Sequence, residues 1–222
     1  MMSCYQGLLA YARETGRKDL LDAAVKTAEQ IVRDEINVAG GCTRGEAWFN
    51  GREKQHLQYH SLQETCVTTT WMRLCETLLS ETGDPKWADE LEKSFYNAYL
   101  AALKADGSEF AAYTPLNGSR YSGHRHCFMH TNCCNANGPR GFLSFLRALL
   151  TSSGRTAFLN FYLSGSSEVV LPECGTRIKL ESYTEYPKAG HVRIVNHTEE
   201  AADFELALRI PAWSEKTVIK VN

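Results

Sequence analysis

The sequence lacks any uninterrupted apolar run close to the roughly 20 residues that a membrane-spanning helix needs, so we expect no membrane as a partner. It also lacks clusters of lysine and arginine. The basic residues are scattered and the formal net charge is −2, which argues against a nucleic-acid partner. The N-terminal stretch has no basic segment of the kind that opens a signal peptide. A cytoplasmic location is therefore favoured, and a periplasmic or secreted one stays open if the natural chain starts upstream.

Cysteine is too sparse for a disulfide-stapled fold, because only eight cysteines are spread over 222 residues. Metal binding, catalysis and simple burial are the remaining roles. Cys75 lies in an apolar helical pattern and Cys174 follows a strand-like run. Because a free cysteine behaves as a small hydrophobic residue, we expect both of these to be buried.

The first part of the chain has the periodicity of helices. In residues 18–36, apolar side chains recur every three to four positions, which predicts an amphipathic helix. Residues 14–26 and 81–93 also share the pattern Glu-Thr-Gly, followed by Asp and Lys. A repeated helix–Thr-Gly–helix unit indicates stacked helical hairpins, as in an α/α toroid.

After about residue 155 the periodicity changes to two, which is typical of strands. The expected strands are EVVLPE, TRIKLESYTEYP, HVRIVNH, FELALRIPAW and the terminal TVIKVN. Helices followed by strands predict an α + β chain with a helical segment at 1–154 and an antiparallel β-sandwich segment at 155–222. Neither segment has enough elements to close on itself, so a homodimer is a candidate assembly.

Glu64 and Cys66 stand two positions apart in the stretch LQETCVTTTW. Within a helix their side chains would point about 200° apart. They converge on one point only if they lie in an extended segment that leads into a helix beginning near Val67. That placement puts Cys66 at a helix N-terminus, where the helix dipole favours a thiolate. The alternative is a surface glutamate and a buried cysteine.

Two adjacent cysteines, Cys133 and Cys134, precede an Asn-Gly-Pro sequence. Pro139 fits the first turn of a helix, so we expect both cysteines in the loop that leads into it. Adjacent cysteines either form a strained disulfide or bind one soft metal ion. With Glu64 and Cys66 they supply three thiolates and one carboxylate, a set of ligands that zinc accepts.

Glu46 lies in the glycine-rich stretch GGCTRGEAWFNG, beside Trp48. Aromatic neighbours can raise the pKa of a loop glutamate, which would suit a general acid. An aromatic side chain near a carboxylate also suits stacking on a sugar ring. The alternative is an ordinary glutamate in solvent.

Three histidines, His124, His126 and His130, lie in the stretch HRHCFMH. Together with Cys127 they offer an alternative metal site. We favour the interpretation that they are polar loop residues lining a cleft, with one or two touching substrate.

Several segments, in this order along the chain, resemble the family 127 glycoside hydrolases, whose founding members are β-L-arabinofuranosidases: GGCTRGEAWF, LQETCVTTTWMRLCETLL, DGSEFAAYTPLNG, HTNCCNANGPRGF and LRIPAW. The pair of motifs Glu-Thr-Cys and Cys-Cys-x-x-Asn carries most of this resemblance. The family module is longer at both ends than this chain.

The resemblance implies an (α/α)6 barrel, or toroid, followed by β-sandwich material. It implies a zinc ion held by Glu64, Cys66, Cys133 and Cys134. It further implies that Cys133 is the nucleophile and Glu46 the general acid/base of a retaining glycosidase, with an arabinofuranoside-containing glycan as substrate. Two alternatives stay open. One is a non-enzymatic module in which zinc only joins two loops, and the other is an inactive truncated product.

Overall fold

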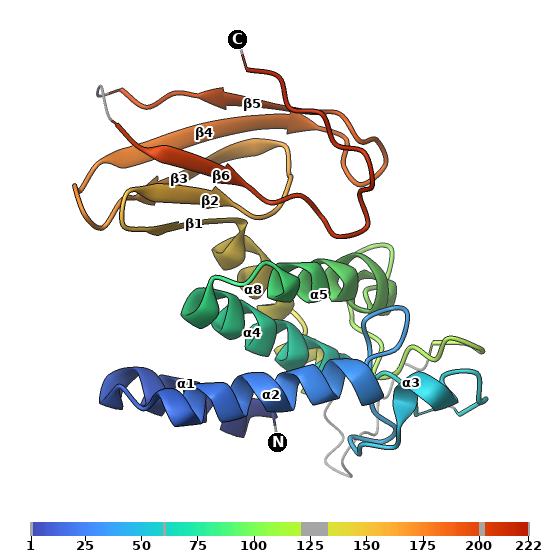
Figure 1. The fold of residues 1–222 in the computed structure, drawn as a ribbon. Helices are drawn as coiled ribbons and strands as arrows, with labels where there is room; N and C mark the ends of the chain where they lie inside the picture. The colour runs from blue at the N-terminus through green and yellow to red at the C-terminus, as the bar shows by residue number, and fades with distance from the viewer. Residues whose placement is uncertain (1, 60, 121–132, 200–202, 222) are drawn as a thin grey trace. The chain divides into compact units, whose positions relative to one another are not determined.

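The structure is a computed structural model that describes residues 2–59, 61–120, 133–199 and 203–221 (Figure 1). The chain divides into two compact units, residues 1–145 and 146–222, and the division falls inside helix α8 (Arg140–Leu149). Helices come first and small sheets follow, so the predicted α + β order is confirmed. Among the described residues, no helix is long and apolar enough to cross a membrane.

The first unit contains two helical hairpins. They are α1 (Met2–Thr15) with α2 (Lys18–Asp34), and α4 (Thr65–Thr82) with α5 (Lys86–Ser94). Each hairpin turns at the glycine of a Glu-Thr-Gly sequence. Gly16 has φ 65° and Gly83 has φ 66°, a left-handed conformation that glycine adopts without steric cost. The sequence repeat is therefore one helix-terminating turn used twice.

The core of this unit lies along α4 and α5. Their larger hydrophobic side chains that are no more than 1% exposed are Trp71, Met72, Leu74, Cys75, Leu78, Trp87 and Leu91. The predicted burial of Cys75 is confirmed. After α5 the chain continues as a π-helix, η1 (Phe95–Tyr99), and the short α6 (Leu100–Ala102). The ring of Phe95 stacks on Phe145 with centroids 3.9 Å apart.

Three loop segments pair beside the start of α4. Single β-bridges join Arg44 to Leu62 and Glu64 to Tyr113. The first segment continues into the short helix α3 (Gly51–Lys54). The pairing places the loop that carries Glu46 next to the residues that open α4.

In the described part of the second unit, six strands make up two small sheets. The first sheet has the order β1 (Leu150–Ser153), β2 (Thr156–Leu159), β6 (Glu205–Leu208), and the second has the order β3 (Gly165–Val170), β4 (Arg177–Thr184), β5 (Val192–Asn196). Alternate residues of β4, Ile178 and Leu180, are fully buried in the core of this unit. The period of two in this segment therefore identified a half-buried strand correctly.

Three expectations for the C-terminal part were wrong. The sheet pairing is not wholly antiparallel, because β6 lies parallel to β2, and alternation of residues does not encode strand direction. The stretch Thr217–Val221 forms no strand, and Val221 is 93% exposed. Cys174 is exposed rather than buried, because it lies in the turn between β3 and β4.

Candidate metal and catalytic site

Glu64 and Cys66 lie at the start of α4. Glu64 has an extended backbone, with φ −63° and ψ 131°, and directly precedes the helix, whereas Cys66 is the second helical residue. This is the predicted extended lead-in, although the helix begins at Thr65 rather than near Val67. The backbone N–H of Thr65 donates to the carbonyl of Ala112 at 2.9 Å, which fixes the junction.

Cys133 and Cys134 are the first two residues of the short helix α7 (Cys133–Asn137). The expectation that they lie in a loop before a helix at Pro139 was therefore wrong. The backbone N–H of Gly138 donates to the carbonyl of Cys134 at 2.7 Å. This bond closes a helical turn that the sequence pattern did not predict. Pro139 instead lies in the turn between α7 and α8.

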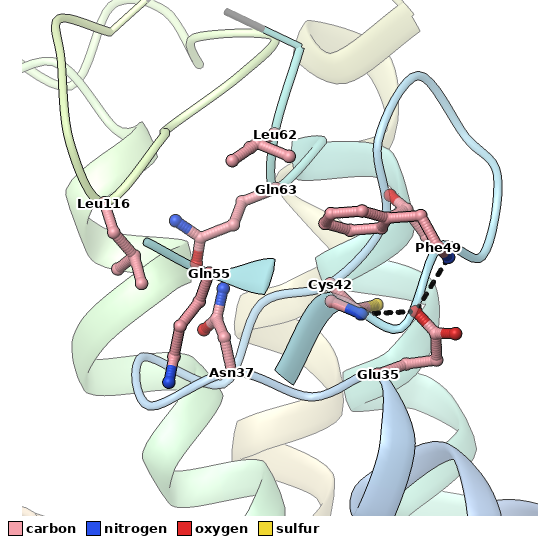
Figure 2. A pocket seen from close by; sticks show the side chains of 10 residues that line it. Glu35, Asn37, Cys42, Phe49, Gln55, Leu62, Gln63 and Leu116 are labelled. Atoms are coloured by element: carbon pink, nitrogen blue, oxygen red, sulfur yellow. Dashed lines mark hydrogen bonds between the residues drawn. The ribbon is translucent and has the colours of Figure 1, made fainter. Parts of the chain in front are cut away.

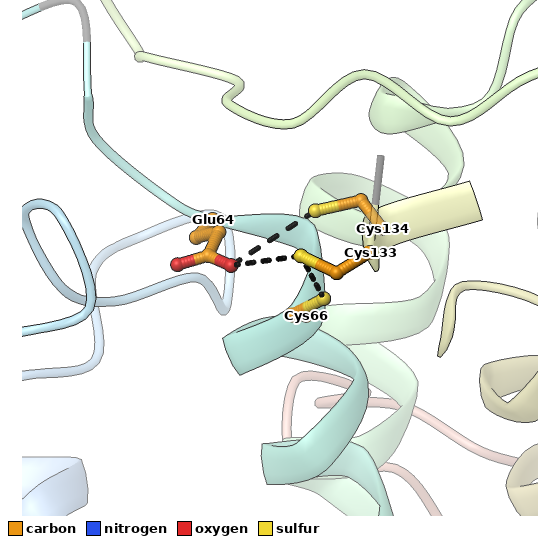
Figure 3. Close-up of side chains that lie close together, drawn as sticks. All are labelled: Glu64, Cys66, Cys133 and Cys134. Atoms are coloured by element: carbon orange, nitrogen blue, oxygen red, sulfur yellow. Dashed lines mark hydrogen bonds between the residues drawn. The ribbon is translucent and has the colours of Figure 1, made fainter. Parts of the chain in front are cut away.

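The four side chains point toward one another from α4 and α7 (Figure 3). The sulfur atoms of Cys66 and Cys133 are 3.3 Å apart. The Oε1 atom of Glu64 lies 4.0 Å from the sulfur of Cys133 and 4.0 Å from that of Cys134. All four donor atoms lie within 4.8 Å of one another, so one ion can contact all of them.

These separations fit a tetrahedral metal site. A zinc ion with sulfur at about 2.3 Å and oxygen at about 2.0–2.2 Å places neighbouring donor atoms roughly 3.5–3.8 Å apart. The separations of 3.3 and 4.0 Å in the structure lie on either side of that range. Three thiols with one carboxyl also match the ligand preferences of zinc. The cluster can therefore hold a metal ion of this kind.

Burial makes the charged forms of these groups unfavourable in the absence of a cation. Glu64 and Cys134 are fully buried, whereas Cys66 and Cys133 are half-buried. Burial, and then the negative charge of the Cys134 thiolate, raises the pKa of Glu64 to about 8. Burial likewise raises the pKa of Cys133 to about 12, and a hydrogen bond with Cys134 contributes most to raising the pKa of Cys66. A bound cation would reverse these preferences.

Glu46 reaches this cluster from the loop before α3. The backbone φ angle of Glu46 is 68°, and that of the preceding Gly45 is 53°. The Gly45 N–H donates to the carbonyl of Ser61 at 2.8 Å, which ties the loop to the lead-in of α4. The charge of Glu46 and a side-chain hydrogen bond between the two residues both contribute to the raised pKa of Glu64. The structure thus brings Glu46 together with the four candidate ligands.

Of the four candidate substrate-binding residues, the structure describes only one. Trp48 is half-buried on the same loop as Glu46, two residues further along the chain. The other three, His124, His126 and His130, lie outside the described residues.

Sequence reasoning missed Glu35, which holds the Glu46 loop in place. This buried carboxylate, 7% exposed, accepts hydrogen bonds from three consecutive backbone N–H groups. The donors are Phe49 at 3.1 Å, Asn50 at 3.0 Å and Gly51 at 3.1 Å. Figure 2 shows Glu35 and Phe49 on one side of a small pocket that Cys42 also lines. An acidic residue at the end of an amphipathic helix gives no sequence signal of such a role.

Comparison with known proteins gives a consistent result. Residues 3–147 match the pattern of the β-L-arabinofuranosidase GH127 catalytic domain, and residues 156–222 match that of the GH127 middle domain. A non-reducing end β-L-arabinofuranosidase of Bifidobacterium longum subsp. longum is 25% identical over 226 aligned positions, which cover 94% of this chain.

Solved structures share the fold. The GH127 β-arabinofuranosidase BT3674 superposes with a TM-score of 0.80 at 28% identity over 96% of this chain. Ara127N-Se, a GH127 β-L-arabinofuranosidase from Geobacillus stearothermophilus T6, superposes with a TM-score of 0.78 at 22% identity over 97% of this chain.

The chain spans about a third of the length of these relatives: 33% of the Bifidobacterium protein, 33% of BT3674 and 35% of Ara127N-Se. The two domain matches are adjacent and together cover almost the whole chain, and the first of them alone covers more than half. On this basis, the chain belongs to the GH127 β-L-arabinofuranosidase family.

Proposed function

We propose that this chain carries the catalytic centre of a retaining glycoside hydrolase of the β-L-arabinofuranosidase type. The observation that carries the proposal is the cluster of three thiols and Glu64, with Glu46 hydrogen-bonded to Glu64. Family membership supports the same class of reaction. We also propose that residues 1–154 are a segment of an (α/α)6 toroid and that residues 155–222 are part of a β-sandwich.

In this proposal zinc is held by Glu64, Cys66, Cys133 and Cys134. When bound, zinc keeps a thiol in the thiolate form at neutral pH. The Cys133 thiol needs such help, because burial raises its pKa to about 12 and leaves it protonated otherwise. Cys133 is half-buried whereas Cys134 is fully buried, so of the two adjacent sulfur atoms that of Cys133 is the accessible one.

The first chemical step is a displacement at the anomeric carbon of the sugar. The Cys133 sulfur forms a bond to that carbon while the bond to the leaving oxygen breaks. Glu46 transfers its proton to the leaving oxygen, so the product alcohol departs neutral. The sugar is left covalently attached to Cys133.

The second step releases the sugar. Glu46, now a carboxylate, takes a proton from water, and the water oxygen bonds to the anomeric carbon as the carbon–sulfur bond breaks. Glu46 is protonated again and the Cys133 thiolate is restored. Two successive inversions retain the anomeric configuration, by the same logic as in retaining enzymes that use two carboxylates.

The substrate in this proposal is an arabinofuranoside-containing glycan. Trp48 offers an apolar face to the sugar, and the candidates for polar contacts are His124, His126 and His130. A homodimer stays a prediction, which light scattering of the purified chain tests directly.

The first test is metal content. Elemental mass spectrometry is applied to the freshly purified, reduced chain and to a variant with Cys133→Ala and Cys134→Ala. A matched control carries Cys4→Ala and Cys174→Ala, which removes two exposed thiols. We expect one zinc per wild-type and control chain and none in the Cys133/Cys134 variant. A wild-type chain without zinc would contradict the proposal.

The second test is turnover of a chromogenic β-L-arabinofuranoside by the full-length protein. Cys133→Ala and Glu46→Gln are each expected to remove turnover, because each removes a group that forms or breaks a bond. Wild-type rates in either variant would refute the role given to that residue.

One observation favours a second candidate function. Four protein donors are enough to complete a tetrahedral site, and zinc sites closed in this way are usually structural. A module in which zinc only joins α4 to α7 would bind the metal without reacting. Intact-mass measurement after exposure to substrate separates the two: a sugar adduct on Cys133 excludes the purely structural role.

A further inference from the structure

Two asparagines of α7 connect the segments that supply the candidate metal ligands. The side-chain N–H of Asn137 donates to the backbone carbonyl of Cys66 at 3.1 Å. The side-chain oxygen of Asn135 accepts a hydrogen bond from the backbone N–H of Phe110 at 2.6 Å. Neither bond uses a thiol or a carboxylate, so both can form whether or not a metal ion is bound.

The segment at residues 110–112 completes a closed circuit of hydrogen bonds. Asn135 ties its first residue to α7. Thr65 ties its other residues to α4, through a 2.9 Å bond from its N–H to Ala112 and a 2.6 Å bond from its hydroxyl to Ala111. Since Asn137 joins α7 back to Cys66, three segments distant in sequence are linked in a closed circuit, and two of these segments supply the four donor atoms.

The far end of α7 is also fixed. The hydroxyl of Tyr99 donates to the carbonyl of Gly138 at 2.7 Å. A Cβ atom at Gly138 would lie only 2.5 Å from the ring of Phe110, so the chain at this point packs directly against that ring. The helix that carries Cys133 and Cys134 is therefore held at its middle and at its C-terminal end by protein groups.

We propose that Asn135 and Asn137 are positioning residues that hold α4 and α7 at the separation a metal ion needs, before the ion arrives. This inference rests on the proposed function, because it takes zinc as the ligand. Groups that orient metal ligands from outside the first coordination sphere typically change metal affinity 10–100-fold when they are removed. A preformed site binds more tightly because less chain has to be ordered when the metal enters.

The experiment measures zinc affinity of the reduced chain by competition with a chromogenic chelator. The variants are Asn137→Ala, Asn137→Leu, which keeps side-chain volume without the donor, and Asn135→Ala. The matched control is Asn160→Ala, because the Asn160 amide also donates to a backbone carbonyl, that of Ala148 at 2.9 Å, in the other unit. We expect roughly tenfold weaker zinc binding in each α7 variant and wild-type affinity in the control.

The outcomes separate the inference from the proposed function. If wild type binds zinc and both Asn137 variants bind it within twofold of wild type, the positioning role is wrong and the proposed function stands. If wild type binds no zinc, both fail. The α7 variants and the Asn160→Ala control can also be compared by melting temperature. If all of them melt at equally lowered temperatures but only the α7 variants lose zinc affinity, the asparagines act by positioning the ligands and not through general stability.

A measurement on the wild-type chain covers the case in which a variant does not fold. Hydrogen exchange of the Phe110 amide is followed in metal-free protein with a chelator present. Slow exchange is expected if the hydrogen bond to Asn135 exists before metal binding. Exchange at the rate of an unprotected amide, which slows only when zinc is added, would overturn the inference, because the metal would then be assembling the site.

Discussion

Metal-free protein is expected to lose stability as the pH rises from about 5 to 8. Glu64 is fully buried, and burial is the main reason why its pKa rises to about 8. In the unfolded chain the same carboxyl has its ordinary pKa of about 4.5. Between these values the folded state keeps a proton that the unfolded state has released. Stability is therefore greatest below about pH 4.5 and falls as the pH rises toward 8.

The size of this effect follows from the two pKa values. Raising a pKa from 4.5 to about 8 corresponds to about 5 kcal/mol of unfolding free energy, since a tenfold change in proton affinity is worth about 1.4 kcal/mol. A domain is typically stable by only about 5–15 kcal/mol, so the loss is easily measured. The raised pKa values of Cys66 and Cys133 act in the same direction at higher pH.

The assay is urea unfolding at pH 5, 6.5 and 8, with reductant and chelator present. Glu64→Gln removes the titrating group while preserving shape, so its unfolding free energy is expected to stay nearly constant across this range. Glu53→Gln, on the exposed face of α3, is expected to follow wild type. With zinc in place of chelator the trend should reverse, because zinc binding releases protons from its ligands. Parallel pH profiles for wild type and Glu64→Gln without metal would refute the reasoning.

Three further predictions concern stability. Glu35→Gln replaces the acceptor of three backbone N–H groups and is expected to cost about 2–4 kcal/mol in urea unfolding, with Glu53→Gln near zero as its control. Gly138→Ala places a methyl group 2.5 Å from the Phe110 ring and is expected to lower the free energy of unfolding by about 1–3 kcal/mol. The control is Gly7→Ala, which has no atom within 4 Å of its Cβ and is expected to raise the free energy of unfolding by up to about 1 kcal/mol. Equal effects of the two substitutions would contradict the packing argument. Leu180→Ala empties a fully buried position in the second unit and is expected to cost about 2–5 kcal/mol, and a loss below 1 kcal/mol would show that the small sheets do not form a cooperative core.

Local features of the fold were predictable because they depend on neighbouring residues. The repeated Glu-Thr-Gly predicted two helix ends, and both glycines adopt the left-handed conformation that such an end requires. The period of two predicted β4, whose alternate residues are buried. Glu64 and Cys66 were predictable as a pair, since two residues so spaced converge only where the chain is extended.

Features that depend on distant partners were not predictable in the same way. The parallel pairing of β6 with β2 depends on how the chain returns after β5. The residues of β6 themselves do not indicate whether the strand runs parallel or antiparallel to β2. Cys174 has the same apolar character as Cys75, yet only Cys75 lies on a helix face that another helix covers. The role of Glu35 emerges only when three backbone N–H groups from a loop 14 to 16 residues away turn toward it.

The backbone conformation around Glu46 supports a functional role for this loop, because a strained conformation persists where function requires it. Positive φ angles in non-glycine residues occur among the described residues at Thr43, Glu46, Asn50 and Gln63, all in or beside this loop. Each such residue typically costs on the order of 1 kcal/mol or more and persists only where surrounding contacts hold it. Glu35 supplies such contacts, since one of its hydrogen bonds comes from Asn50 itself. The buried carboxylate therefore offsets backbone strain in the segment that brings Glu46 to Glu64, which ties the stability of the loop to the geometry of the proposed acid/base.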